Sequence, residues 1–426
     1  MRMCSFVLFV NFAISAQSAT PKVIYVDANA PLGGKGTAAK PFNTIGDAVD
    51  RARTVGGDPI IKVEPGRYEL ASTIIIDIPL DLVGSNVMEI DSNGWPTGVI
   101  QPGTETLVIG LAALGQLPLV SVGAPDPLVM NDVNIQGFTF EGGPGGGNDI
   151  DLKRVQNFSV SANVVTGPSP LPMTGTTITG IFPAASSGSI VGNYIAGEGC
   201  GTCITAGYPG SPAYLQFTGN RSVKNKNGGL LLNGSSFGIP EHGDQLNVLV
   251  LGNDLSENTD SNSFGLRIYV IRKDLPDTQS SGNVNALILS NRLFGNQIGI
   301  SIDAGFPYRQ TKIPPKTGSL VCDTRVYSGS LNITLFGNTL SGSLLTPGLI
   351  SFTRVTATLD PTQQMSWQYL HNATYIITDP QGSLAGYLKD DPSTDPFVGG
   401  LCAADVASEI LGNTLTYNGA VVLPTP

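Results

Sequence analysis

Three stretches of the chain repeat one alternation of apolar and polar residues. Each begins with an alternating run, turns at a Gly-Asn or Ser-Asn pair, and continues into a second alternating run that opens with glycine. The three copies lie between positions 215 and 303 and read LQFTGNRSV with GGLLLNG, LVLGNDL with FGLRIYV, and LILSNRL with IGISID. Alternation with a period of two indicates β-strands that bury one face. The pattern therefore predicts a repeating all-β structure.

A repeat of this length cannot bury its apolar face alone, so its copies must stack, each coil adding a rung about 4.8 Å along an axis. This arrangement is a parallel β-helix. We expect the asparagines at its corners to lie one above another, each amide bonded to the next coil. These residues are Asn193, Asn220, Asn253, Asn291 and Asn338. A glycine precedes each of them except Asn291, which follows a serine.

The glycine-opened runs align with one another as GLLLN (229–233), GLRIY (265–269) and GISID (299–303). Strand alternation then assigns alternate side chains to the interior and the exterior. The inward set is Leu230, Leu266, Ile300, Leu232, Ile268 and Ile302, and the outward set is Leu231, Arg267, Ser301, Asn233, Tyr269 and Asp303. Long polar inserts follow positions 233, 270 and 303. Inserts that leave successive coils at one corner lie side by side, so we expect them to wall a groove on the outward face.

This expected groove contains residue types that carry out acid–base chemistry. A basic residue can remove a proton beside a carboxylate while a second group stabilises the enolate, and paired carboxylates can act as acid and base around a scissile bond. The candidate catalytic residues are Arg267, Asp303, His242, Asp244, Lys273 and Arg309. The candidate substrate-binding residues are Asn233, Tyr269, Tyr308 and Arg272. Asp303 either orients a catalytic group or ties the third insert to its coil, and His242 is either catalytic or an ordinary surface histidine.

The charge of the chain changes sign over the same region. Residues 264–326 contain eight basic and four acidic residues, whereas the whole chain carries a formal net charge of −10. A basic patch on an acidic molecule favours docking of a polyanion, such as an acidic polysaccharide or glycoconjugate, although solvated loops explain the patch equally well. The acidic balance of the whole chain argues against nucleic acid as a partner.

The two ends of the chain predict export and capping. Residues 1–19 contain Arg2, an apolar run and small residues at the expected cleavage position, which is typical of a signal peptide. No later apolar run is long enough to span a membrane, so we expect a secreted protein, whether extracellular, periplasmic or at the cell surface. We expect an N-terminal cap with an amphipathic helix over 20–60, the β-helix over 61–354, and a last coil with an irregular C-terminal cap over 355–426.

Acidic residues and cysteines add two further predictions. Residues 69–152 contain eleven acidic residues and no Lys or Arg, which favours either Ca²⁺ held between carboxylates or a solvated acidic flank. No motif demonstrates a cofactor.

Beyond the predicted signal peptide there are four cysteines, Cys200, Cys203, Cys322 and Cys402. An even number in an exported protein predicts disulfides, one of them local or inter-coil at the CxxC pair and one that joins Cys402 to Cys322.

The segment YVDANAPLGGKGTAAKPFNTIGDAVDRARTVGG, followed by IIKVEPGRYEL, resembles the N-terminal segment of secreted proteins of the pectin lyase-like superfamily. The resemblance continues through the later GNxL coils and implies a right-handed parallel β-helix. That superfamily includes lyases, glycoside hydrolases, epimerases, tailspikes and adhesins, so the resemblance selects no reaction. The catalytic motifs of polygalacturonases, alginate epimerases and pectate lyases are absent from this sequence, and no catalytic residue is transferred by matching.

Three functions remain open at this point. An enzyme acting on an acidic polysaccharide, as a lyase or a glycoside hydrolase, predicts that Arg267, Asp303 and His242 or Lys273 converge in an open cleft. A glycan-binding or adhesive protein predicts exposed aromatic residues along the expected groove, such as Tyr269, Phe306 and Tyr308, without clustered acids and bases. A purely structural exoprotein predicts no groove. The stacked inserts and the charge reversal favour the first function.

Overall fold

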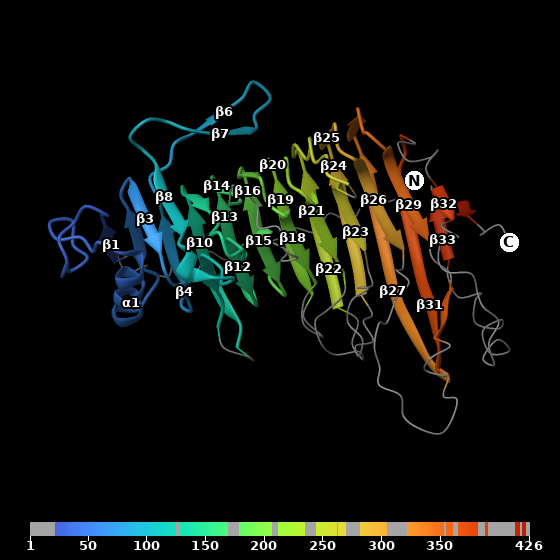
Figure 1. Cartoon of the computed structure of the whole chain (residues 1–426), viewed down its shortest axis with the longest axis horizontal. Coiled ribbons are helices and arrows are strands. Elements are labelled where there is room, and N and C mark those ends of the chain that lie inside the picture. The colour runs from blue at the N-terminus through green and yellow to red at the C-terminus, as the bar shows by residue number, and fades with distance from the viewer. Residues whose placement is uncertain are drawn as a thin grey trace, which may run out of the picture.

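The computed structural model in Figure 1 describes most of the chain as a stack of β-coils. The described residues are 22–124, 128–168, 179–206, 212–234, 244–261, 263–269, 282–304, 322–352, 355–360, 365–381, 388–390, 414–417 and 420–422. Successive coils pair through parallel strands, and the chain is a right-handed parallel β-helix, as the sequence predicts. Three sheets form its sides.

Sheet 1 has fourteen strands and contains the longest of them. Its parallel strands are β1 (Val23–Val26), β2 (Ile60–Val63), β5 (Leu80–Val83), β10 (Met130–Gln136), β13 (Val155–Ser161), β16 (Gly188–Val191), β19 (Ala213–Thr218), β22 (Asp244–Leu251), β24 (Gly282–Leu289), β27 (Cys322–Phe336), β31 (Met365–Thr378) and β33 (Thr414–Tyr417). Two strands pair antiparallel near its C-terminal end, β30 (Val355–Asp360) with β31 and β34 (Ala420–Val422) with β33. These antiparallel pairs interrupt the parallel stacking at the C-terminal end.

Sheet 2 is built from short strands, and sheet 3 contains the glycine-opened runs. Sheet 2 consists of β3 (Gly66–Leu70), β8 (Thr106–Gly110), β11 (Thr139–Glu141), β14 (Val164–Thr166), β17 (Tyr194–Ala196) and β20 (Arg221–Val223), and isolated bridges connect it to β25 (Arg292–Phe294) and β28 (Thr339–Ser341). Sheet 3 consists of β4 (Ile74–Ile76), β9 (Val120–Val122), β12 (Ile150–Lys153), β15 (Thr179–Ala184), β18 (Cys200–Thr205), β21 (Gly228–Asn233), β23 (Phe264–Tyr269), β26 (Ile298–Ala304), β29 (Thr346–Phe352) and β32 (Leu388–Asp390).

Stacked apolar side chains fill the interior of the coils. Leu230 pairs with Leu266, and Leu266 pairs with Ile300, in consecutive strands of sheet 3. All three side chains are fully buried, which confirms the predicted alignment and its inward face. Such columns remove apolar surface from water at every coil, and this burial is the main stabilising contribution to the stack.

A first asparagine ladder follows the corner between sheets 1 and 2, and the predicted residues form it. The Nδ2 of each asparagine donates to the Oδ1 of the next, with distances of 2.9, 3.2, 2.8 and 2.9 Å from Asn193 to Asn338. The ladder starts one coil earlier than predicted, because Asn163 donates to Asn193 Oδ1 at 3.1 Å. An alanine, Ala162, takes the left-handed φ of 52° before Asn163, at the place where most other coils use glycine.

A second asparagine ladder lies at the corner between sheets 2 and 3, where none was predicted. Its residues Asn225, Asn258 and Asn296 are all buried. The Asn225 N–H donates to Asn258 Oδ1 at 2.9 Å, and the Asn258 N–H donates to Asn296 Oδ1 at 3.0 Å. A β-carbon at Gly265 would lie 2.7 Å from Asn296 Nδ2, so this ladder explains the glycine near the start of the sheet 3 strand beside it.

The N-terminal end of the β-helix is covered by α1 (Ile45–Val55), the amphipathic helix expected within 20–60. Thr44 caps it by accepting a hydrogen bond from the Asp47 N–H at 3.1 Å. Its buried face, made of Ile45, Ala48, Val49 and Ala52, packs against β1, β2 and β4. The helix protects the apolar end of the first coils from water and from pairing with another chain.

A hairpin of β6 (Met88–Ile90) and β7 (Pro96–Ile100) projects from the first coils and runs along the axis toward later ones (Figure 1). Trp95 in its turn donates from Nε1 to the Gly252 carbonyl oxygen at 2.8 Å, and the Arg292 guanidinium lies 5.8 Å from the Trp95 ring centroid. Arg221 and Arg292 both pair with the buried Asp254 Oδ2, at 3.3 and 3.2 Å. The hairpin therefore straps the N-terminal coils to later coils. A short helix, η1 (Ala112–Leu114), lies between β8 and β9.

Candidate binding groove

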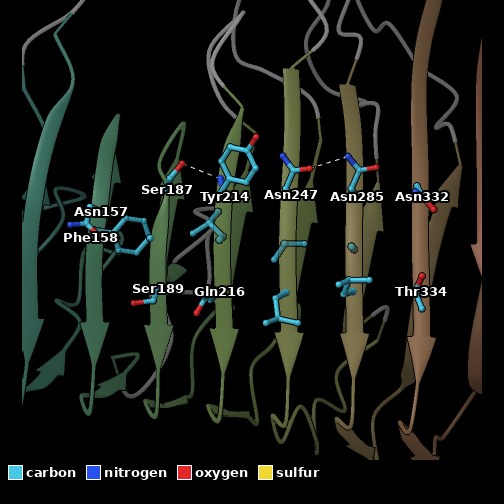
Figure 2. Close-up of a pocket in the computed structure, with 16 residues that line it drawn as sticks. Asn157, Phe158, Ser187, Ser189, Tyr214, Gln216, Asn247, Asn285, Asn332 and Thr334 are labelled. Carbon is cyan, nitrogen blue, oxygen red and sulfur yellow. Dashed lines mark hydrogen bonds between the residues drawn. The ribbon is translucent and has the colours of Figure 1, made fainter. Parts of the chain in front are cut away.

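A groove of about 700 Å³ lies on the outward face of sheet 1, from β13 to β27 (Figure 2). Its floor is made of the alternate side chains that point away from the apolar interior, because sheet 1 buries only one face. The volume falls within the usual range of pockets for small organic ligands. Parallel register, rather than proximity in sequence, brings its residues together.

One row of the groove floor is polar and crosses four neighbouring strands. Tyr214 of β19 pairs with Asn247 of β22, which pairs with Asn285 of β24, which pairs with Asn332 of β27. The Asn285 Nδ2 donates to Asn247 Oδ1 at 3.0 Å, as Figure 2 shows. Tyr214 is 58% exposed, and its backbone N–H donates to Ser187 Oγ at 3.0 Å. The hydrogen bond between Asn285 and Asn247 orients the two central amides, and the Tyr214 residue stays accessible to a ligand.

A second row lies two residues further along each strand and is partly apolar. Gln216 pairs with Leu249, which pairs with Leu287, which pairs with Thr334. Leu287 is 50% exposed, although leucine is usually buried. The floor therefore combines amide and hydroxyl groups with exposed aliphatic surface. We name the groove formed by these two rows the amide groove.

The amide groove is suited to binding rather than to acid–base chemistry. Among the described residues that line it there is no Asp, Glu, His, Lys or Arg. Asn and Gln side chains both donate and accept hydrogen bonds, and the hydroxyls of Ser, Thr and Tyr do the same. The groove can therefore match the hydroxyl groups of an uncharged ligand. The described floor contains no carboxylate, imidazole or amine that could act as a general base or as a nucleophile.

The groove expected on sheet 3 is tested only in part. The structure confirms that β21, β23 and β26 are neighbours in one sheet, with Asn233 opposite Tyr269 and Tyr269 opposite Asp303. Five predicted residues lie outside the described residues, namely His242, Arg272, Lys273, Tyr308 and Arg309. The side chains of Asp244, Tyr269 and Asp303 also lie outside the described part of the structure. Convergence of the proposed catalytic set therefore stays a prediction.

Two of the described residues at outward positions of sheet 3 are buried and do not form an open groove floor. Asn233, a predicted substrate-binding residue, is 3% exposed, and Ser301 is 4% exposed. Thr205, which pairs with Asn233 in the preceding strand, is also buried. The Arg267 guanidinium lies 5.6 Å from the Phe264 ring centroid on its own strand. Asn233 and Ser301 are therefore buried although they occupy outward positions, and the role of Asn233 in substrate binding stays a prediction.

The cysteine prediction is confirmed at one pair. Cys200 and Cys203 form a disulfide within β18, so the local alternative is correct. The side chain of Cys322 and the whole of Cys402 lie outside the described residues, and their pairing stays a prediction.

The acidic segment is not a solvated flank throughout. Asp149 and Asp151 are 1% and 4% exposed, so that interpretation is wrong for these two residues. Asp77 pairs with Arg53 at 2.7 Å and Asp151 pairs with Lys153 at 2.8 Å, so neither carboxylate lacks a cationic partner. In the part of the chain that the structure describes, no three His, Cys, Asp or Glu side chains are grouped to hold a metal ion.

Within the same residues, no helix has the length and apolar character needed to cross a membrane.

Comparisons with known proteins give structural similarity alone. No protein-family model and no curated protein sequence matches the chain. The A-module of mannuronan C-5 epimerase AlgE6 from Azotobacter vinelandii is 14% identical with a TM-score of 0.40, and the match covers 79% of this chain and 82% of that one. The A-module of AlgE4 from the same organism is 13% identical with a TM-score of 0.35, over 83% of this chain and 88% of that one.

A rhamnogalacturonan lyase is 12% identical with a TM-score of 0.37, and the match covers 88% of this chain and 86% of that chain. Identities and TM-scores at this level do not identify an activity.

Proposed function

We propose that this protein binds an uncharged glycan chain in the amide groove on the outward face of sheet 1. The observation that carries the proposal is the row Tyr214, Asn247, Asn285 and Asn332, which four neighbouring strands present side by side. The exposed aromatic residue and the lack of described ionisable side chains at this floor are features that the glycan-binding alternative expected in a different groove, the one on sheet 3.

The spacing of the row favours an extended ligand that runs along the helix axis. Neighbouring strands lie about 4.8 Å apart, so equivalent side chains recur at that interval from coil to coil. A polymer of sugar units lying along the axis meets an amide at each coil and can hydrogen-bond to it through its hydroxyls. The Tyr214 ring and the exposed Leu287 side chain offer apolar surface to the C–H faces of the same sugar rings.

The composition of the floor also favours a neutral ligand over an acidic one. A carboxylate that enters a groove loses hydration, and this cost is recovered only when a cation or several donors replace the water. The described floor has no Lys or Arg to supply that compensation. The acidic polysaccharide expected from the basic residues in 264–326 is therefore not the ligand proposed for the amide groove.

The proposal is tested by binding of the intact protein to a panel of neutral and uronate-containing polysaccharides, followed by calorimetry with oligosaccharides of the best ligand. Tyr214→Ala and Asn285→Ala should each weaken binding by about tenfold, since each loses about 1 to 2 kcal/mol of contact. Asn131→Ala is the matched control, because Asn131 is exposed on the same sheet outside the groove. Equal binding by all variants would refute the proposal.

A second candidate function is an exported enzyme that cleaves an acidic polysaccharide over sheet 3. It is favoured by Arg267 and Asp303, which neighbouring strands β23 and β26 carry. In this scheme Arg267 holds a sugar carboxylate, a basic insert residue removes the neighbouring proton, and Asp303 orients one of them. Asp303→Asn should then abolish product formation on a uronate polymer and leave the melting temperature unchanged. Full retained activity of this variant on a confirmed substrate would refute the scheme.

A further inference from the structure

Two carboxyl groups, those of Asp149 and Glu198, are buried together at the corner between sheets 2 and 3. Asp149 is 1% exposed and Glu198 is fully buried. Among the described residues, no N–H or hydroxyl group donates a hydrogen bond to any of their four carboxyl oxygens. Burying a charge without a partner is costly, so the arrangement of this pair needs a physical explanation.

Glu198 occupies a position of the second asparagine ladder. Its backbone N–H donates to Asn225 Oδ1 at 3.0 Å, in the way that the Asn225 N–H donates to Asn258 Oδ1 at 2.9 Å in the next coil. Elsewhere in this ladder the side chain is a neutral amide that both donates and accepts, as when Asn258 Nδ2 donates to Asn296 Oδ1 at 2.9 Å. A neutral carboxylic acid has the same donor and acceptor functions, whereas a carboxylate can only accept.

Asp149 occupies a position that later coils assign to glycine. The register of sheet 3 pairs Ile150 with Ile181, and the residues just before them are Asp149 and Gly180. In later coils this glycine position adjoins the ladder, since a β-carbon at Gly201 would lie 2.8 Å from Asn225 Nδ2. Asp149 therefore places its carboxyl group next to the ladder corner. The two carboxyl groups are close enough for each to influence the pKa of the other.

The surroundings offer this pair no cation among the described groups. Burial, and then the negative charge of Glu198, raise the pKa of Asp149 well above its usual value, and Glu141 on β11 adds to the effect. Burial raises the pKa of Glu198 to about 8. Asp151 and Lys153, on β12, pair with each other. Lys226 is exposed and contacts Glu198 through its backbone N–H, which donates to the Glu198 carbonyl oxygen at 2.7 Å.

We propose that Asp149 and Glu198 share a proton at neutral pH, and that this carboxyl–carboxylate hydrogen bond closes the N-terminal end of the second asparagine ladder. The protonated group takes the place of the ladder amide and keeps one of the two buried charges from forming. Loss of that proton at alkaline pH leaves two buried carboxylates facing each other, which repel and open the corner. The pair therefore stabilises this corner at neutral and acidic pH and destabilises it at alkaline pH.

The direction of the pH dependence follows from linkage. In the unfolded chain Asp and Glu titrate at about pH 4, so there both side chains are ionised above about pH 5. In the folded protein the pKa of Glu198 is about 8, and the pKa of Asp149 is raised as well. A folded-state pKa above the unfolded value means that the stabilising contribution is complete below about pH 4 and is lost as the pH rises through 8.

The test is the melting temperature of the full chain between pH 5 and pH 9, for the wild type and for Glu198→Gln, which keeps a neutral donor and acceptor. The wild type should lose stability from pH 6 to 9, and Glu198→Gln should lose clearly less. The matched control is Glu257→Gln, because Glu257 is partly exposed, pairs with Lys224 and lies beside the same ladder. This control should follow the wild type.

A second measurement applies even if a variant folds poorly. The infrared spectrum of the wild type at pH 7 should contain the carbonyl band of a buried protonated carboxylic acid, and this band should disappear by pH 9. Parallel pH curves for the wild type and Glu198→Gln, or absence of the band at pH 7, would overturn the proposal. It would also be overturned if added Ca²⁺ at pH 7 raised the wild-type melting temperature and not that of Glu198→Gln, since the pair would then hold a cation.

Discussion

Replacing Asn253 with alanine tests the first asparagine ladder at its centre. Asn253 is fully buried, and its Oδ1 accepts from the Asn220 N–H at 2.8 Å and from Asn220 Nδ2 at 3.2 Å. Its Nδ2 donates to the Phe217 carbonyl oxygen at 2.9 Å and to Asn291 Oδ1 at 2.8 Å. The backbone N–H of residue 253 still donates to Asn291 after the change. Four hydrogen bonds through one side chain are therefore lost.

The loss in free energy of unfolding depends on the groups that lose their hydrogen-bond partner. The substitution leaves two buried donors of Asn220, its N–H and its Nδ2–H, without the acceptor that satisfied them. Each unsatisfied buried donor costs about 1 to 3 kcal/mol, so the free energy of unfolding should fall by about 2 to 6 kcal/mol. Asn220 itself is buried, which keeps bulk water from replacing the lost acceptor.

The assay is urea unfolding followed by circular dichroism. The matched control is Asn285→Ala, because Asn285 is partly exposed on the outward face of β24 and its Nδ2 donates one hydrogen bond to Asn247. That variant should lose less than about 1 kcal/mol, since water can reach the groups it leaves. If Asn253→Ala is no less stable than Asn285→Ala, the ladder contributes nothing specific to stability and the reasoning fails.

The hairpin strap gives two further predictions, each measured by urea unfolding at pH 7. Trp95→Phe keeps an aromatic ring beside Arg292 and removes the hydrogen bond to the Gly252 carbonyl oxygen. The free energy of unfolding should therefore fall by about 0.5 to 1.5 kcal/mol. A stability equal to that of the wild type would mean that this hydrogen bond does not stabilise the hairpin on the later coils. Asp254→Asn removes the buried charge shared by Arg221 and Arg292 and should cost about 3 kcal/mol, the lower end for a broken buried pair, because both arginines are partly exposed. An unchanged midpoint for this variant would show that the ion pairs are not stabilising.

Much of the fold could be predicted because it depends on local patterns. Period-two alternation fixed which residues point inward, and the shared glycine aligned Leu230, Leu266 and Ile300 in neighbouring strands, as the structure has them. The corner asparagines were visible because most of them follow a glycine. Asn163 was missed because Ala162 takes the left-handed conformation in place of glycine. In the second ladder Lys224 and Glu257 do the same before Asn225 and Asn258, and hid those corners in the same way.

The amide groove was missed because its residues are far apart in sequence. Asn247, Asn285 and Asn332 each belong to a strand that reads as ordinary half-buried alternation, and long inserts separate them. A signal was nonetheless present, because each stands six positions before a corner asparagine, as Tyr214 does before Asn220. Counting back from the corners would have placed them in one row. The strap could not be predicted, since its contacts join Trp95 to residues more than 150 positions later.

The most direct test of the glycan-binding account is a crystal structure of the protein with a neutral oligosaccharide identified on the glycan panel. The account predicts that the sugar chain lies along the helix axis over β19, β22, β24 and β27. Its hydroxyls should contact Asn247, Asn285 and Asn332, and one sugar ring should lie against Tyr214. An oligosaccharide bound over Arg267 and Asp303 on sheet 3, with the amide groove empty, would contradict it.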